Sequence, residues 1–167
     1  KQGKESATNG LLNQLKLIGI NKFVSPSYNW LKVNIEDNFN KPLALFIPGV
    51  SKGNEYKQWQ PEKFAEIAEY AENKNYLICV VGTNADLISV NPILQKCTNI
   101  INKIDLSPPE VVYSIALKSK LILTNDTGPG HIAALSNNNT LWIANENSVT
   151  KANILNTKNS YKISKKS

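Results

Sequence analysis

The sequence predicts an α/β fold built on a doubly wound parallel sheet. Short apolar runs typical of buried strands alternate with helical stretches between residues 42 and 144. Each helix that connects two such strands must pack back onto the sheet, so the alternation predicts parallel strands with helices on both faces. The chain has 167 residues, 41% of them hydrophobic, which suits one compact domain with a core and is short for two.

The first 41 residues are expected to form an N-terminal helix and a connecting arm. Leucine and isoleucine recur at helical spacing within residues 9–20, and Gly19 marks the end of this helix. Residues 21–41 are polar, contain Pro26 and hold one short alternating stretch, which favours an arm over a core element.

The main domain is expected to cover residues 42–150. Its strands are predicted at 43–47, 76–81, 99–104, 121–124 and 140–144, and its helices at 61–73, 86–96, 108–118 and 131–136. Residues 151–167 are polar and are expected to form a C-terminal tail with one late strand at 161–164.

The charge of the chain argues against nucleic acid as a partner. Its net charge is +6, yet all nineteen basic residues are lysines, whereas phosphate and base recognition usually recruits the planar arginine side chain. Some lysines gather near the ends of the chain, where two interpretations stay open: solvated tails, which we favour, or peripheral contact with an anionic membrane. These lysines are Lys1, Lys4, Lys16, Lys158, Lys162, Lys165 and Lys166.

The cellular setting predicted from the sequence is the cytoplasm. Two cysteines are too few for a disulfide framework or a zinc site and suit a reducing interior. No apolar run approaches the roughly 20 residues of a membrane helix, and no signal peptide is recognisable, so we expect a soluble chain. Because the sequence starts at Lys1 and lacks methionine, it is expected to be a piece of a longer product.

Two loops that follow predicted strands offer groups for binding an anion or a ribose, since ligands of such folds bind at the carboxyl ends of the strands. Residues 48–59 combine two glycines, the Ser51 hydroxyl and the cations of Lys52 and Lys57. A plain solvated turn is an equal alternative there. In residues 82–86, Asp86 either binds ribose hydroxyls or, as we favour from the residue alone, complements a helix N-terminus.

A third loop is the most informative. It runs Asn125-Asp126-Thr127-Gly128-Pro129-Gly130-His131. Two glycines flank a proline where a strand gives way to a helix, which predicts a tight turn whose free amides fit a diphosphate. The alternative makes the acid and the threonine helix caps, and the histidine a core residue or a cap that bonds its own turn. A cap needs neither the stiff glycine-proline-glycine segment nor a histidine, so we favour a binding site.

The motifs of several enzyme classes are missing from the sequence. It has no Gly-x-Ser-x-Gly elbow, no Gly-x-Gly-x-x-Gly after the first strand, no Walker phosphate loop and no pair of histidines for a metal. Hydrolases, dehydrogenases, ATP-hydrolysing enzymes and zinc enzymes are therefore disfavoured.

Together, the three loops resemble those of glycosyltransferase family 9, the heptosyltransferases. The resemblance rests on Phe46-Ile47-Pro48-Gly49, on Lys57-Gln58-Trp59 with Pro61, on Val80-Val81-Gly82, and on Leu123-Thr124-Asn125-Asp126-Thr127-Gly128-Pro129 with His131, Ala133 and Ala134. It implies a two-domain enzyme of the GT-B type, whose Rossmann-like halves face each other. This chain is similar to the C-terminal half, which holds the donor, so the N-terminal domain that brings the acceptor and the catalytic base would lie outside it.

The resemblance also implies roles for single residues. The donor would be ADP-heptose or another nucleotide sugar, and the acceptor a lipopolysaccharide or another saccharide or lipid-linked molecule at the inner face of the inner membrane. Lys57 and either Ser51 or Gly53 would bind the phosphates, Asp126 and His131 would approach the sugar and phosphate, and Asp86 would reach the ribose. The candidate binding residues are Ser51, Lys57, Asp86, Asp126, Thr127, Gly128 and His131, and no metal or cofactor is implied.

Two other functions stay open at this point. The chain is alternatively a nucleotide-binding module without activity, or a domain similar to nucleotide-sugar epimerases, which share this architecture. An epimerase needs acid and base residues beyond those that the loops offer.

Overall fold

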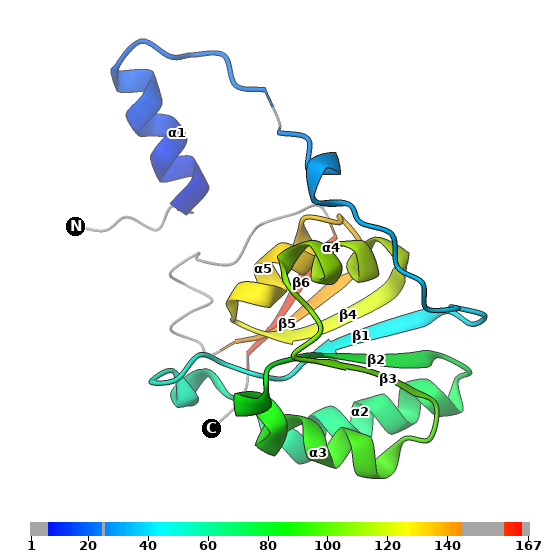
Figure 1. Ribbon diagram of the computed structural model, residues 1–167. Helices are drawn as coiled ribbons and strands as arrows, with labels where there is room; N and C mark the ends of the chain where they lie inside the picture. Colours follow the sequence, from blue (N-terminus) through cyan, green and yellow to red (C-terminus); the bar gives the residue numbers. More distant parts are fainter. Residues whose placement is uncertain (1–6, 25, 145–158, 165–167) are drawn as a thin grey trace.

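Six parallel strands form a single sheet in the computed structural model, which describes residues 7–24, 26–144 and 159–164 (Figure 1). The strands lie in the order β3-β2-β1-β4-β5-β6. Their bounds are β1 Leu43–Ile47, β2 Leu77–Gly82, β3 Ile100–Ile104, β4 Ser119–Asn125, β5 Thr140–Ala144 and β6 Ser160–Ser164. The predicted α/β class, with a doubly wound parallel sheet, is confirmed.

Helices cover both faces of the sheet. In Figure 1, α2 (Pro61–Asn73) and α3 (Leu87–Lys96) lie on one face, and α4 (Pro109–Lys118) and α5 (Gly128–Ala134) lie on the other. The chain therefore builds outward from β1 to β3 and then crosses back to add β4 on the other side of β1. This reversal leaves β1 and β4 as neighbours whose following loops diverge, which is where doubly wound folds bind their ligands.

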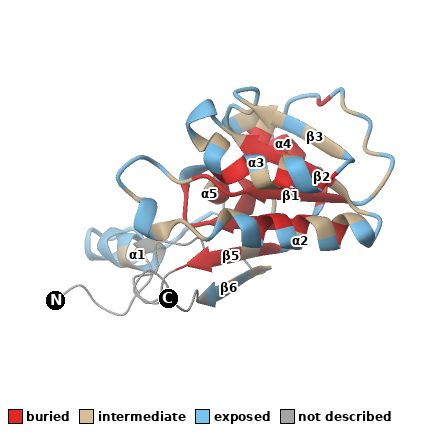
Figure 2. Ribbon diagram, turned by 90° about the horizontal axis from the view of Figure 1, so that it is seen from below, coloured by how far each residue is buried: buried red, intermediate tan, exposed pale blue. Residues whose placement is uncertain are grey.

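The central strand β1 explains why the sheet needs two helical layers. All five of its residues are buried, as Figure 2 shows in red. Ala44 and Phe46 share a hydrophobic cluster with Phe64 of α2, whereas Leu45 shares the opposite cluster with Ile115 of α4. Because successive side chains of a strand point to opposite faces, an uninterrupted apolar run predicts burial on both sides.

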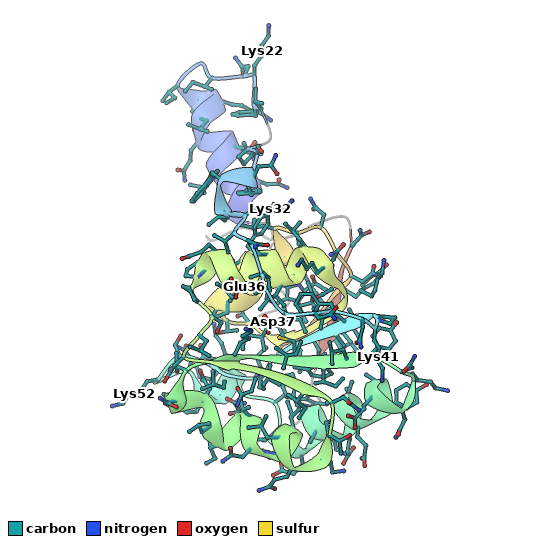
Figure 3. All side chains as sticks on the ribbon, turned by 45° about the vertical axis from the view of Figure 1, so that its right-hand side comes forward. Lys22, Lys32, Glu36, Asp37, Lys41 and Lys52 are labelled. Carbon is teal, nitrogen blue, oxygen red and sulfur yellow. The ribbon has the colours of Figure 1, made fainter. Side chains whose placement is uncertain are left out.

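The connecting arm is partly packed against the domain. Leu31 and Ile35 are buried, and the backbone amide of Val33 donates to Oγ of Ser114 at 2.9 Å. Asp37, labelled in Figure 3, pairs with Lys103 of β3 at 2.7 Å. Ile35, which precedes the expected domain start at residue 42, thus adds to the hydrophobic cluster that contains Leu45.

The segments at the two ends differ in how they join the sheet. The N-terminal helix is present as α1 (Ala7–Leu17) and stands away from the sheet, with Lys22 beyond it (Figures 1 and 3). The expected late strand is present as β6, which pairs in parallel with β5, so the sheet extends past residue 150. The terminal lysines Lys1, Lys4, Lys158, Lys165 and Lys166 lie outside the described residues.

One predicted helix start is wrong. The sequence pattern placed it at His131 and left the glycine-proline-glycine segment in a turn, but α5 begins at Gly128. Proline is favoured in the first turn of a helix, because its missing amide hydrogen would have no partner there and its φ angle already suits the helix. The segment is therefore the first turn of α5 and not a loop that precedes it.

Candidate functional site

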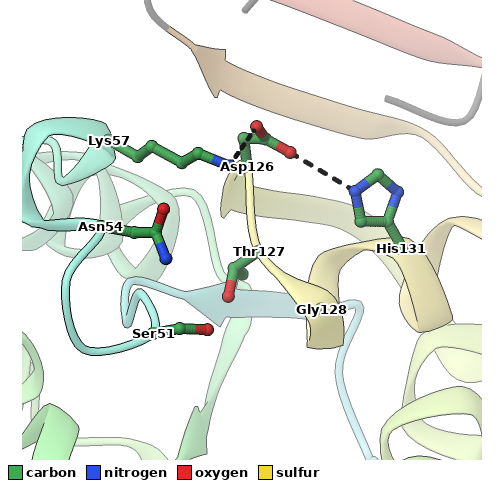
Figure 4. Close-up of a pocket in the computed structure, with 7 residues that line it drawn as sticks. All are labelled: Ser51, Asn54, Lys57, Asp126, Thr127, Gly128 and His131. Carbon is green, nitrogen blue, oxygen red and sulfur yellow. Dashed lines mark ion pairs between the residues drawn. The ribbon is translucent and has the colours of Figure 1, made fainter. Parts of the chain in front are cut away.

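A cavity of about 240 Å³ lies at the carboxyl ends of β1 and β4. Its lining comes from the loop after β1 and from the junction of β4 with α5 (Figure 4). The lining residues are Ser51, Asn54, Lys57, Asp126, Thr127, Gly128 and His131. Six of the seven candidate residues are thus brought together at the point where the strand order reverses.

Asp126 is the central charged group of this cavity. Its side chain is only 3% exposed, and its two oxygens face different partners: Oδ1 lies 3.4 Å from Nε2 of His131, and Oδ2 lies 2.9 Å from Nζ of Lys57. Oδ2 is buried and, within the described residues, accepts no hydrogen bond of good geometry, so the lysine acts on it as a charge. Both partners remain about a quarter exposed and can reach a ligand.

The surroundings keep Asp126 ionised. The contact with His131 lowers the pKa of its carboxyl most, the ion pair with Lys57 lowers it further, and burial opposes both by disfavouring the charged form. The net shift is downward, so the carboxyl is a carboxylate at neutral pH. Such a group can orient cations and accept hydrogen bonds, but it is a poor proton donor.

His131 is held on the opposite side by an aromatic residue. Its ring centroid lies 5.0 Å from that of Trp142, a fully buried residue of β5. The imidazole ring therefore packs against Trp142, and its Nε2 edge reaches Asp126. Figure 4 shows the contact with Asp126. The alternative that His131 is a core residue is wrong, because it is partly exposed and lines the cavity.

Thr127 has the backbone geometry of a helix N-cap but does not use its side chain for it. Its φ and ψ are −144° and 158°, and it makes no capping hydrogen bond to the first turn of α5. The interpretation of Thr127 as a side-chain cap is therefore wrong, and its hydroxyl is available to the cavity that the residue lines.

Lys57 is positioned by a short turn of helix in the loop after β1. Residues Glu55–Lys57 form the 3-10 helix η2, and the next residue, Gln58, donates from Nε2 to the carbonyl oxygen of Pro48 at 2.7 Å. The loop thereby closes on its own start, directly after β1. This closure carries the Lys57 side chain over the end of β4, where Asp126 follows.

Asp86 lies apart from this group. It serves the local helix start: the backbone amide of Thr83 donates to its Oδ2 at 2.9 Å, and the Thr83 hydroxyl does so at 3.0 Å. This is the capping box at the 3-10 helix η3 (Asn84–Asp86), the helix-terminal role that the residue alone favoured. Asp86 also lines a second cavity of about 280 Å³, which shares Ser51 and Thr127 with the first.

Asn54 was missed by sequence reasoning. It lines the first cavity together with Ser51 and Lys57. No signal in the sequence separates it from other polar residues of its loop, because its position depends on how the loop folds back between residues 48 and 58.

Two kinds of structural feature are not found in the part of the chain that the structure describes. Among residues 7–24, 26–144 and 159–164, no three His, Cys, Asp or Glu side chains gather in a way that would hold a metal ion. Over the same residues, none of the helices combines the length and the apolar character that a membrane crossing requires.

The sequence profile described as "Glycosyltransferase family 9 (heptosyltransferase)" matches residues 17–144, well over half of the chain. The chain belongs to glycosyltransferase family 9. Among family 9 relatives, the chain is 33% identical over 106 residues to the lipooligosaccharide heptosyltransferase 2 of Haemophilus ducreyi. That alignment covers 59% of this chain and 29% of the relative.

Solved structures share the fold. The family 9 glycosyltransferase of Veillonella parvula superposes with a TM-score of 0.78 at 17% identity and covers 100% of this chain and 52% of its own. The E. coli heptosyltransferase WaaC, solved with ADP, superposes with a TM-score of 0.65 at 14% identity over 78% of this chain and 40% of its own. The chain thus spans about half the length of these family 9 relatives or less.

Proposed function

We propose that this chain binds the diphosphate of a nucleotide-sugar donor in the cavity between β1 and β4, as the donor half of a glycosyltransferase. The observation that carries the proposal is the cluster of Lys57, Asp126 and His131 beside the first turn of α5. A partly exposed lysine and histidine, fixed by one buried carboxylate, form a preorganised group of donors for phosphate oxygens. ADP, with which the E. coli protein of similar fold was solved, is the first ligand to test.

The proposed reaction transfers the sugar from the nucleoside diphosphate to a hydroxyl of a saccharide or lipid-linked acceptor, without a covalent enzyme intermediate. The bond between the sugar and the diphosphate breaks, and its electrons leave with the diphosphate, while the acceptor oxygen forms the new bond and gives up its proton to a base. Lys57 would stabilise the negative charge that grows on the leaving diphosphate. Asp126 would hold Lys57 and His131 in place.

The base for the acceptor hydroxyl is expected outside this chain. Asp126 is the acid at the centre of the cavity, and it is engaged on both oxygens by Lys57 and His131. A base must approach the acceptor hydroxyl within hydrogen-bond distance, and an acid engaged on both sides is poorly suited to that. From the resemblance to two-domain family 9 enzymes, we assign acceptor binding and the base to a further domain. We assign the reaction to the cytoplasm, where the free thiols of Cys79 and Cys97 would stay reduced.

The first experiment compares two lysines of the same loop by titration calorimetry with ADP. Lys57→Ala is expected to weaken ADP binding by roughly 10- to 100-fold, since a charge-assisted hydrogen bond contributes about 1.5–3 kcal/mol. Lys52 is exposed and lies outside the first cavity, so Lys52→Ala is expected to cost less than about fivefold, as for other exposed charges. Equal losses for the two variants would contradict the role of Lys57, and folded wild-type chain that ignores millimolar ADP would contradict the site.

The second experiment separates binding from turnover. The purified chain is incubated with nucleotide sugars and candidate acceptors, and the products are followed by mass spectrometry. We expect donor binding without repeated transfer, because the base is assigned elsewhere. Transfer by this chain that Asp126→Asn abolishes would place a base inside the domain and overturn the division of roles.

A further inference from the structure

The last residue of β4, Asn125, ties together the two loops that build the cavity. Its side chain is fully buried. Nδ2 donates to the carbonyl oxygen of Pro48 at 2.7 Å, and Oδ1 accepts from the backbone amide of Trp59 at 3.2 Å. One amide group therefore binds both the start and the end of the loop after β1.

These two bonds hold the backbone close to Lys57. Trp59 follows Lys57 by two residues, and Asp126 is the residue next to Asn125. The backbone on either side of the Lys57–Asp126 ion pair is thus fixed by the same side chain, which leaves the lysine little freedom to move away from the carboxylate. The Gln58 side chain supports the closure through its own bond to the oxygen of Pro48.

We propose that Asn125 is a positioning residue that acts through Lys57 to set the geometry of the diphosphate site. The inference rests on the proposed function for its ligand. Both partners of Asn125 are backbone groups far away in sequence, 77 and 66 residues distant, so the side chain serves the assembly of two loops rather than its own turn.

Asparagine suits this task because its planar amide carries a donor and an acceptor in one short, neutral side chain. Aspartate would lose the donor that Pro48 needs and would add a second negative charge beside Asp126. Serine is neutral but too short to serve both partners, so it opens the closure without changing the charge of the site. Asn125→Ser is therefore the informative variant.

The test measures ADP binding by calorimetry for Asn125→Ser alone and in the Lys57→Ala background. We expect Asn125→Ser to weaken binding at least about tenfold, as for loss of a charge-assisted contact. In the Lys57→Ala background the same change should cost less than about twofold, because sites that act through one another are not additive. A full loss in both backgrounds, or unchanged binding by folded Asn125→Ser, would overturn the proposal.

A matched control separates positioning from general destabilisation. Asn138 also donates from Nδ2 to a backbone carbonyl at 2.7 Å, that of Ala116, but it lies outside the cavity. Asn138→Ser is expected to lower the unfolding free energy and to leave ADP affinity within about twofold of wild type. If Asn125→Ser does not fold, Gln58→Ala is the second variant. It removes the other side-chain bond to the oxygen of Pro48, together with the longer contact of Nε2 with the carbonyl oxygen of Trp59 at 3.3 Å. Its smaller loss of affinity must likewise vanish in the Lys57→Ala background.

A ligand-independent measurement keeps this proposal distinct from the proposed function. The coupling between Lys57 and Asp126 is obtained from urea unfolding of Lys57→Ala, Asp126→Asn and the double variant. We expect this coupling in wild type and its loss in the Asn125→Ser background. If the coupling survives in the Asn125→Ser background, the role of Asn125 is refuted, whether or not ADP binds. If the coupling is lost but ADP does not bind, the positioning role of Asn125 is supported and a different ligand must be tested.

Discussion

Two glycines of the same turn, Gly128 and Gly130, are expected to differ in their response to alanine: the change at Gly130 destabilises the fold, and the change at Gly128 leaves its stability nearly unaltered. A Cβ atom on Gly130 would overlap Oγ1 of Thr124 and lie 3.0 Å from Cζ3 of Trp142. Both neighbours are fully buried, and the Thr124 hydroxyl donates to the carbonyl oxygen of Asn125 at 2.8 Å, so neither can move aside freely. A Cβ atom on Gly128 would meet no atom within 4 Å.

The magnitude follows from two opposing terms. Alanine in place of glycine favours a helix by about 1 kcal/mol, whereas overpacking a filled core costs about 1–3 kcal/mol. The overlap at Gly130 is with buried side chains, so we take the upper part of this range and expect Gly130→Ala to lower the unfolding free energy by roughly 1–2 kcal/mol. For a chain of this size, that corresponds to a fall in Tm of about 2–8 °C. Gly128→Ala is expected to stay within about 0.5 kcal/mol of wild type.

The assay is urea unfolding followed by circular dichroism, with thermal unfolding as a second measure, both without ligand because Gly128 lines the cavity. The pair of variants controls for helix propensity, since both changes add the same methyl group to the first turn of α5. If Gly130→Ala is as stable as wild type, the close packing of α5 against β4 and β5 is not as described. If Gly128→Ala is the less stable of the two, the assignment of open space around it is wrong.

Two further predictions concern titratable groups. The contacts with His131 and Lys57 lower the pKa of Asp126 from its ordinary 3.8, so the stability that its carboxylate contributes is present above pH 3.8 and is lost as pH falls through the folded-state pKa. In urea titrations from pH 6 to pH 3, the difference in unfolding free energy between wild type and Asp126→Asn should therefore shrink. A constant difference would contradict the ion pair. Burial raises the pKa of Cys79 to about 12 and of Cys97 to about 11. An aromatic disulfide reagent at pH 8 should therefore modify neither thiol in the native chain and both thiols after unfolding. Rapid labelling of the native chain would contradict their burial.

The regular elements could be predicted from the sequence because their signals are local. The apolar run of β1 requires burial on both faces, and α2 begins at Pro61 and ends at Asn73 as its pattern predicts. The start of α5 could not be predicted, because glycine and proline in succession are typical of turns. The tertiary fit of this segment is likewise hidden from a sequence pattern, because the space beside Gly130 is filled by Thr124 and Trp142 of two other elements.

The candidate site could be predicted as far as the ends of the strands could be located in the sequence. Residues after β1 and β4 meet in one cavity because these strands are neighbours. Asp86 follows β2, the other neighbour of β1, and lines the second cavity, which shares Ser51 and Thr127 with the first. The burial of Leu31 and Ile35 could not be predicted from the polar residues that surround them in the sequence, since it depends on where α4 lies. Asn54 was missed for a related reason: its place depends on the closure of its loop.

The buried carboxylate of Asp126 poses an electrostatic question, because a site for an anion would be expected to exclude negative charge. Lys57 and Asp126 are oppositely charged and largely cancel at a distance, so long-range attraction for the proposed diphosphate ligand would come from elsewhere, including the net charge of +6 on the chain. The carboxylate restricts the conformational freedom of the lysine side chain before any ligand binds. Without the carboxylate, the ligand itself would have to fix that side chain, at an entropic cost of up to about 2 kcal/mol. With Asp126 holding both Lys57 and His131, most of that cost falls on the folding of the domain rather than on binding. A carboxylate at the centre of the proposed anion site is therefore consistent with preorganisation, in which the acid would fix the groups that contact the phosphates instead of contacting them itself.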